Sequence, residues 1–296
     1  MPPGNLPGNN LYVVRQRIIL TAGGLVLLAC LFFFGKIETQ KSAFPHTEPI
    51  SPILNIGSLI QKAKQKLTSP QLIGVSRIEN SISRGDVKGQ SYRQTQQLAE
   101  FWKDSAKVFL PYAYYLSEAA KLDNSEKNLT FAARLILDSM RNEEDPGIKS
   151  WEAETASTLF GKAIVLDPSN DDLKVDLGSC YVYGKGMAGD AAETMKGIQQ
   201  LLQVVKKDSN NMKAQMVLGI GGVISRQYPK AIDRLNKVIS AQPSNLEAVS
   251  WLADAYAGSG DKHAAVNWYE YSKKLVNNAE YSKEVDERIK ALNAPR

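Results

Sequence analysis

A repeat with a period of about 34 residues in the C-terminal half restricts the fold of this chain more than any other feature. The recurring pairs are Leu218 and Leu252, Gly219 and Ala253, and Ala231 and Ala265. A period of this length is typical of helical-hairpin solenoids, in which each unit buries its apolar face only against its neighbours. The sequence therefore predicts an all-α fold of stacked hairpins, each with a first helix A and a second helix B.

Small residues at fixed positions indicate where the two helices of a hairpin cross. In the last full unit, helix A carries Leu252, Ala253 and Tyr256, and helix B carries Ala265. Gly260 stands between them, where a residue without a Cβ allows the positive φ of a helix end. The position of Ala265 predicts a close crossing that leaves no room for a bulky side chain.

Two further copies lie upstream of these units. Leu177, Gly178 and Tyr181 repeat the helix A pattern, but Leu177 precedes Leu218 by 41 residues. The interval is seven residues longer than the period. We place the extra residues in the A–B turn, in the stretch 183–193, because the stacked faces of a solenoid cannot accommodate an insertion. An earlier hairpin is predicted with helix A over 128–141 and a helix B that ends at 166–168.

These residues resemble the tetratricopeptide repeat (TPR) family over about residues 127–277. The positions that carry the resemblance are Leu177, Gly178, Tyr181, Leu218, Gly219, Ala231, Leu252, Ala253, Tyr256 and Ala265. Gly197 and Gly222 depart from the pattern, standing where the family has alanine and a bulky residue.

The resemblance implies a right-handed superhelix whose A helices line a concave groove that binds protein segments. The groove-facing positions would be Val175, Ser179, Val182, Met216, Ile220 and Val223. Alternatively, some of these side chains pack against neighbouring helices. Family members that grip a C-terminal carboxylate use a set of Lys and Asn along the groove. Here only Lys213 has a comparable position, so that clamp is not expected.

An apolar run near the N-terminus predicts a membrane anchor. Residues 18–35 are uncharged and mostly apolar, which is long enough for a helix to span the hydrocarbon core. Arg15 and Arg17 lie in the tail 1–17, which favours a cytoplasmic N-terminus with the bulk of the chain outside the cytoplasm. Two alternatives stay open: a cleaved signal peptide, and a lipoprotein modified at Cys30.

The rest of the chain divides by composition. Residues 36–52 form a polar linker, 53–126 a helical region of atypical or degenerate repeats, 127–279 the repeat array and 280–296 a C-terminal capping helix. An amphipathic pattern over 53–67 predicts a helix that packs on the array or pairs with a partner helix. An aromatic cluster between Phe101 and Tyr115 is interpreted as core, or alternatively as a partner-binding surface.

The sequence offers little for catalysis. The only histidines are His46 and His263, and Cys30 and Cys180 have no partners for a disulfide framework or a metal site. The stretch GKGMAG (184–189) matches a dinucleotide-binding loop, but it follows a repeat helix instead of a strand, so a flexible turn is expected. No catalytic residue, cofactor, metal or small-molecule substrate is predicted. The net charge of +5 is spread through the helices, so no nucleic acid is expected either.

The sequence thus predicts a non-enzymatic, membrane-anchored scaffold or adaptor. It would bind protein partners through its concave groove, on the periplasmic side of a bacterial inner membrane. One alternative is a cytoplasm-facing regulatory subunit of a complex that processes protein or nucleic acid. The other is an enzyme with its site in residues 60–125, where no acid–base pair is visible.

Overall fold

The structure, a computed structural model, describes residues 54–82 and 88–294, and every regular element in these two ranges is helical. The predicted tail, the anchor 18–35 and the linker lie outside the described residues. No helix in the described part is long and apolar enough to cross a membrane. The α-helices are α2 (Ile56–Lys64), α3 (Ser69–Ile82), α4 (Lys88–Glu100), α5 (Phe109–Asp123), α6 (Glu126–Met140), α7 (Pro146–Leu166), α8 (Asp171–Tyr181), α9 (Ala191–Lys207), α10 (Met212–Ile224), α11 (Tyr228–Ala241), α12 (Leu246–Ser259), α13 (Lys262–Val276) and α14 (Ala279–Asn293), with π-helical turns η1 (Phe101–Ser105) and η2 (Val182–Gly186).

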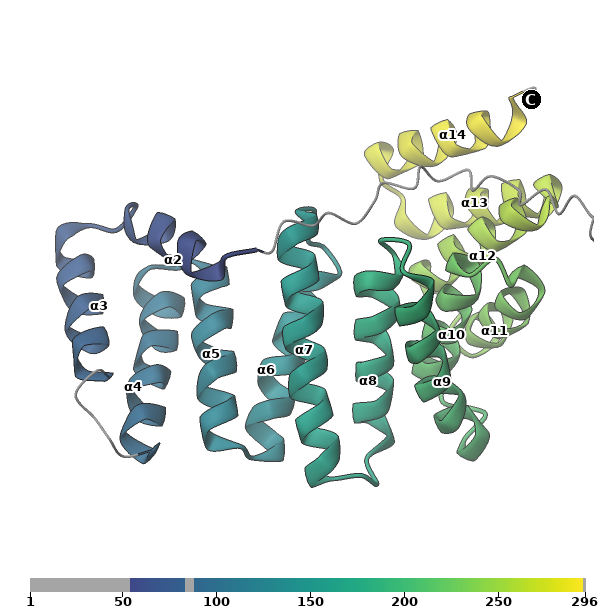
Figure 1. Cartoon of the computed structure of the whole chain (residues 1–296). Coiled ribbons are helices and arrows are strands. Elements are labelled where there is room, and N and C mark those ends of the chain that lie inside the picture. The colour runs from purple at the N-terminus through teal and green to yellow at the C-terminus, as the bar shows by residue number, and fades with distance from the viewer. Residues whose placement is uncertain (1–53, 83–87, 295–296) are drawn as a thin grey trace, which may run out of the picture. The chain divides into compact units, whose positions relative to one another are not determined.

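The helices pair into antiparallel hairpins that stack in chain order (Figure 1). The pairs are α4–α5, α6–α7, α8–α9, α10–α11 and α12–α13, and α14 packs on α13. The helix predicted over 128–141 corresponds to α6, and α14 lies where the capping helix was predicted. The helix predicted over 53–67 is shorter than expected, because α2 ends at Lys64.

An asparagine begins helix A in three successive hairpins. The side chains of Asn170, Asn211 and Asn245 accept hydrogen bonds from backbone N–H groups in the first turns of α8, α10 and α12. An N-cap of this kind stabilises a helix by about 1 kcal/mol. The three asparagines are spaced 41 and 34 residues apart, as the repeat requires. The period in the sequence is thus also a period of helix starts.

Small residues let the helices of a hairpin approach closely. A Cβ added to Gly219 would lie 2.7 Å from Leu235 Cγ, and one added to Gly178 would lie 2.7 Å from Leu201 Cγ. A Cβ on Gly222 would lie 3.0 Å from that of Ala231, which is fully buried. The predicted crossing of helices A and B is therefore confirmed in register.

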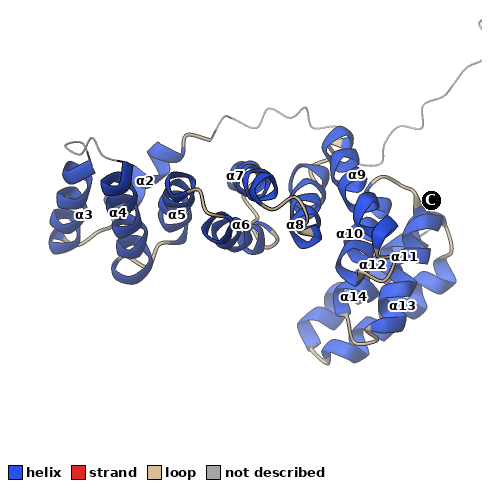
Figure 2. Ribbon diagram, turned by 90° about the horizontal axis from the view of Figure 1, so that it is seen from below, coloured by secondary structure: helices blue, strands red, loops and turns tan. Residues whose placement is uncertain are grey.

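The direction of the helices changes along the array. Seen from below, α3 to α8 are viewed nearly end-on, whereas α13 and α14 lie across the view (Figure 2). The same change is visible in Figure 1, where the early helices stand upright and α13 and α14 lie across the picture. Because of this rotation, the first turn of α12 lies against the end of α6, although the hairpins α8–α9 and α10–α11 lie between them in chain order.

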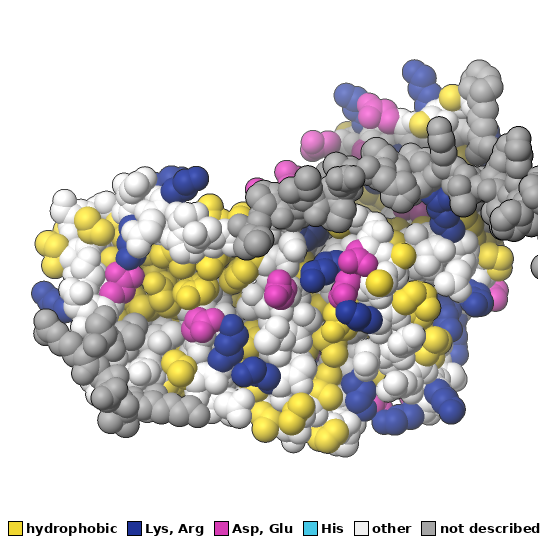
Figure 3. Space-filling view, viewed as in Figure 1, with side chains coloured by type: hydrophobic (Ala, Val, Ile, Leu, Met, Phe, Trp, Pro, Cys, Tyr) yellow, Lys and Arg dark blue, Asp and Glu magenta, His cyan; other side chains and the backbone are white. Residues whose placement is uncertain are grey.

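The first helices share a smaller apolar cluster of their own. Trp102 is fully buried at its centre, and Phe101, Tyr112, Tyr114 and Tyr115 pack around it half-buried. These aromatic residues therefore form a core, as interpreted from the sequence, except that Phe109 is 40% exposed. In the space-filling view, apolar side chains gather over α2, α3 and α5 (Figure 3). A role of this surface in partner binding stays a prediction.

Candidate functional site

Five of the six residues predicted to line the groove are buried, and the sixth is half-buried. Val182 and Ile220 are fully buried, Val175, Ser179 and Met216 are buried, and Val223 is half-buried. A Cβ added to Gly221 would meet Val182 Cγ2 at 3.5 Å, so this stripe of α8 packs against the next A helix. The alternative in which these positions contact neighbouring helices is the one found. Their binding to a partner stays a prediction, and they form no open surface in this structure.

A neighbouring stripe of the A helices carries charged residues. Asp172, Lys213 and Glu247 occupy equivalent positions in the first turns of α8, α10 and α12, by the same spacings of 41 and 34 residues. One turn further along, Asp176 is equivalent to Trp251. These positions lie within one turn of the predicted ones. Asp172, Asp176, Lys213 and Glu247 are charged, whereas five of the six predicted residues are apolar.

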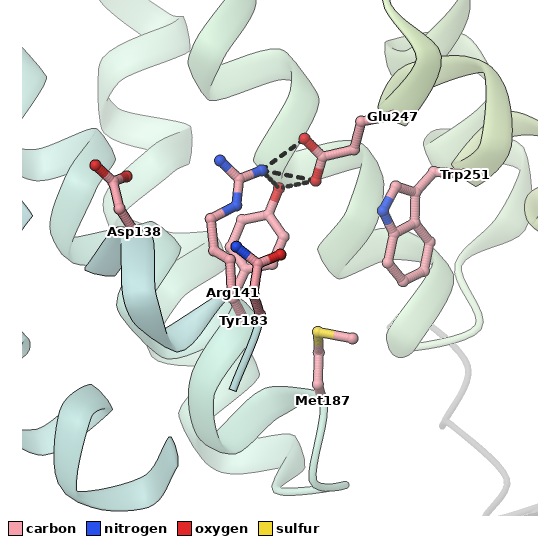
Figure 4. Close-up of a pocket in the computed structure, with 7 residues that line it drawn as sticks. Asp138, Arg141, Tyr183, Met187, Glu247 and Trp251 are labelled. Atoms are coloured by element: carbon pink, nitrogen blue, oxygen red, sulfur yellow. Dashed lines mark hydrogen bonds and ion pairs between the residues drawn. The ribbon is translucent and has the colours of Figure 1, made fainter. Parts of the chain in front are cut away.

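A three-residue bridge joins α6, η2 and α12 on this stripe (Figure 4). One terminal nitrogen of Arg141 donates to both carboxylate oxygens of Glu247, at 2.7 and 2.5 Å. The same nitrogen lies 3.0 Å from the hydroxyl of Tyr183, which in turn donates to Glu247 at 2.8 Å. The guanidinium carbon also lies 4.5 Å from the centre of the Tyr183 ring. Arg141 and Glu247 are 106 residues apart in sequence.

The electrostatics of the bridge follow from its burial. Burial raises the pKa of Tyr183, and the neighbouring Glu247 carboxylate raises it further. The phenol therefore stays protonated and donates to Glu247. The ion pair itself is open to water, since the Arg141 and Glu247 side chains are 38% and 39% exposed. The bridge thus has a fixed tyrosine and two charges that a ligand can reach.

The seven-residue insertion builds part of this site. It continues α8 as the π-helical turn η2, which carries Tyr183, and then turns back at Gly189 with a φ of +92°. A Cβ on Gly184 would lie 2.5 Å from that of Ala153, so only glycine lets η2 pack this closely on α7. Residues 184–186 of GKGMAG therefore belong to a packed π-helical turn, and only residues 187–189 form a turn of the kind that was expected. π-Helical turns occur often at functional sites.

A pocket of about 520 Å³ opens beside the bridge. Its lining comes from the end of α6, from η2 and the turn after it, and from the start of α12: Asp138, Arg141, Asn142, Tyr183, Met187, Glu247 and Trp251. Figure 4 shows Trp251 and Asp138 on opposite sides of the bridge, with Met187 beneath. None of these residues was predicted as a site. The available signals were the insertion itself and a charged residue at the start of successive A helices.

The described residues offer no evident reaction centre. In residues 54–82 and 88–294, no group of three or more His, Cys, Asp or Glu side chains could hold a metal ion. Cys180 is buried in α8, and burial raises the pKa of its thiol, which disfavours the reactive thiolate. The chemistry available at the pocket is therefore recognition through charge, hydrogen bonding and an aromatic surface.

No family model matches the sequence, and no curated protein matches it either. Among solved structures, MamA is similar with 20% identity over 63% of this chain and 92% of its own, at a TM-score of 0.45. A tetratricopeptide repeat protein from Parabacteroides merdae has 13% identity over 81% and 94%, with a TM-score of 0.46. TTC0263, a thermophilic TPR protein from Thermus thermophilus, has 14% identity over 70% and 98%, with a TM-score of 0.47. At these values the likeness carries no conclusion about family or function.

Proposed function

We propose that this chain is a non-enzymatic scaffold of the tetratricopeptide repeat type, and that a partner protein binds at the pocket beside the Arg141–Glu247 bridge. The observation that carries the proposal is the pocket itself. Segments from the A helices of three different hairpins meet there. They place the solvent-accessible charges of Arg141 and Glu247 next to the ring of Trp251. The repeat pattern supports a binding role, since such arrays commonly bind protein segments.

The residue types in the pocket suit a protein partner. Trp, Tyr and Arg are enriched among residues that dominate binding energy at interfaces, and the pocket contains one of each. Met187 is 47% exposed, and a flexible thioether adapts to different side chains. A pocket of this size accommodates one or two side chains of an extended partner segment.

We further propose that residues 18–35 anchor the chain in a bacterial inner membrane with the array in the periplasm. The support is the length and apolarity of this run and the arginines that precede it. A reporter that is active only outside the cytoplasm, fused after residue 296, tests the orientation. Activity of that reporter supports the proposal, whereas activity of a cytoplasm-specific reporter would favour the cytoplasm-facing regulatory subunit.

The binding proposal is tested by affinity capture from native membranes with a matched pair of variants. Met187→Trp fills the mouth of the pocket, and Met195→Trp makes the same change on α9, where the methionine is 42% exposed and lines no part of the pocket. A partner that is lost with Met187→Trp and retained with Met195→Trp supports the proposal. Capture that is unchanged by Met187→Trp would contradict it.

A further inference from the structure

The charges around the pocket are unequal once the bridge has formed. The lining contains two carboxylates, Asp138 and Glu247, and one cation, Arg141. Arg141 is already engaged, because it bonds Glu247 and lies on the ring of Tyr183. In the described part of the chain, no hydrogen bond or ion pair reaches the Asp138 carboxylate, which is exposed. The pocket therefore carries a net charge of about −1 and one unpaired acid.

From this geometry we infer that the pocket takes the positively charged side chain of a lysine or arginine from the partner segment. The inference rests on the proposed function and specifies the partner's chemistry. The ammonium or guanidinium group would pair with Asp138 or with the open side of Glu247, and its aliphatic stem would lie along Met187 and Trp251.

The bridge already shows, within the chain, a basic side chain held by a carboxylate and an aromatic ring together. Arg141 combines a carboxylate partner with an aromatic face, at 2.7 Å from Glu247 and 4.5 Å from the Tyr183 ring centre. Trp251 is half-buried and leaves part of its indole accessible in the pocket. A cation over a tryptophan face is stabilised by about 0.5–1 kcal/mol at an exposed site. Long basic side chains also cover apolar surface with their stems while the charge stays in water.

Other side chains fit the pocket less well. An incoming carboxylate would meet Asp138 and would have to displace Glu247 from Arg141, breaking an existing ion pair. A purely apolar side chain would bury reachable charges without a partner, which is unfavourable. The whole chain has a net charge of +5, so its overall field repels a basic segment. Selection of a basic side chain must therefore come from the pocket itself.

The test uses a random-peptide library displayed on phage and selected on the detergent-solubilised full-length chain. We expect the selected peptides to be enriched in Lys or Arg next to an apolar residue. Asp138→Asn should weaken their binding about two- to fivefold, as for an exposed ion pair, and Asp138→Lys should weaken it about tenfold or more. Asp172→Lys is the matched control, because Asp172 is an exposed acid of α8 that does not line the pocket.

The possible outcomes separate this inference from the proposed function. Peptides rich in Lys or Arg that are lost with Asp138→Lys and retained with Asp172→Lys support both. Acidic or neutral peptides whose binding is lost with Met187→Trp would leave the pocket as the binding site and overturn its preference for a basic side chain. If no peptide is selected, or if binding is unchanged by Met187→Trp, the proposed function itself fails.

Discussion

Arg141 and Glu247 form an ion pair across the array, with the hairpins α8–α9 and α10–α11 lying between their own hairpins in chain order. Contacts in a solenoid are usually made between successive units. This one connects the end of α6 to the start of α12 and therefore fixes the rotation accumulated over the hairpins in between. The pocket exists because this rotation brings the two helix ends together.

Glu247→Gln should weaken the bridge with little effect on global stability. Both charged side chains are more than one third exposed, so the pair contributes only about 0.2–1 kcal/mol. The local effect should be larger, because the first turn of α12 loses its contact with α6 and η2. Hydrogen exchange measured by mass spectrometry should become faster in these segments and stay unchanged in α4 and α5. Equal exchange in all segments would mean that the bridge does not constrain the array.

Ala231→Trp should disrupt the array. Ala231 is fully buried, and the crossing with Gly222 leaves no space for an indole. Overpacking of this kind costs about 1–3 kcal/mol or more, which a thermal melt followed by circular dichroism would detect. Ala241→Trp is the control, because Ala241 is exposed at the end of the same helix. Equal melting temperatures for the two variants would contradict the register of the hairpins.

Gly184→Ala should reduce partner capture, whereas Gly161→Ala should not. A Cβ on Gly184 would overlap Ala153 and push η2, with Tyr183, away from the bridge. A Cβ on Gly161 would meet nothing within 4 Å, so alanine there should stabilise α7 by about 1 kcal/mol through its higher helix propensity. Melting curves and capture assays on both variants test this. The account predicts opposite signs for the two melting shifts, and shifts of the same sign would contradict it.

Glu152 should make the stability of the array depend on pH. Its side chain is fully buried, and burial raises the pKa of the carboxyl from 4.5 to about 7, against a smaller lowering by the neighbouring Ser139 hydroxyl. The folded chain holds the proton of the Glu152 carboxyl more tightly than the unfolded chain does. The free energy of unfolding should therefore be highest below about pH 4.5 and should decrease as the pH rises to about 7. The contribution is up to about 3 kcal/mol.

The comparison with Glu152→Gln isolates this effect. The variant keeps the shape of the side chain and cannot ionise, so its urea midpoint should exceed that of the unchanged chain at pH values above the shifted pKa. Between the two pKa values the midpoints should converge as the pH falls. Parallel curves for the two proteins across this range would show that Glu152 does not titrate in the folded state.

The repeat was predictable because it depends on local spacing. Ala231 and Ala265, with Gly219 and Ala253, mark the helix crossings in the sequence, since a close crossing requires small residues at a fixed interval. The helix starts could be located in the same way, because asparagine caps recur with the period. The insertion after Tyr181 was also visible, as a change in that period.

The site was not predictable from these patterns. The groove positions inferred from family geometry include Val175 and Met216, which are apolar because the next hairpin covers them. The pocket lies on the neighbouring stripe that carries Glu247 and Trp251, and which stripe stays accessible depends on the rotation between hairpins, which no single residue encodes. The contact between Arg141 and Glu247 depends on several such rotations added together. The π-helical form of the insertion was hidden as well, because the glycines of GKGMAG suggested a flexible turn.

The most direct test of the central claim is site-specific photocrosslinking in cells that make the full-length chain. A photoreactive amino acid replaces Met187 at the mouth of the pocket in one strain, and Met195 on α9 in the other. The account predicts a crosslinked partner protein from position 187 and none from position 195, with loss of the crosslink when Asp138→Lys is added. A partner crosslinked only from position 195, or a crosslink at 187 that survives Asp138→Lys unchanged, would contradict the account.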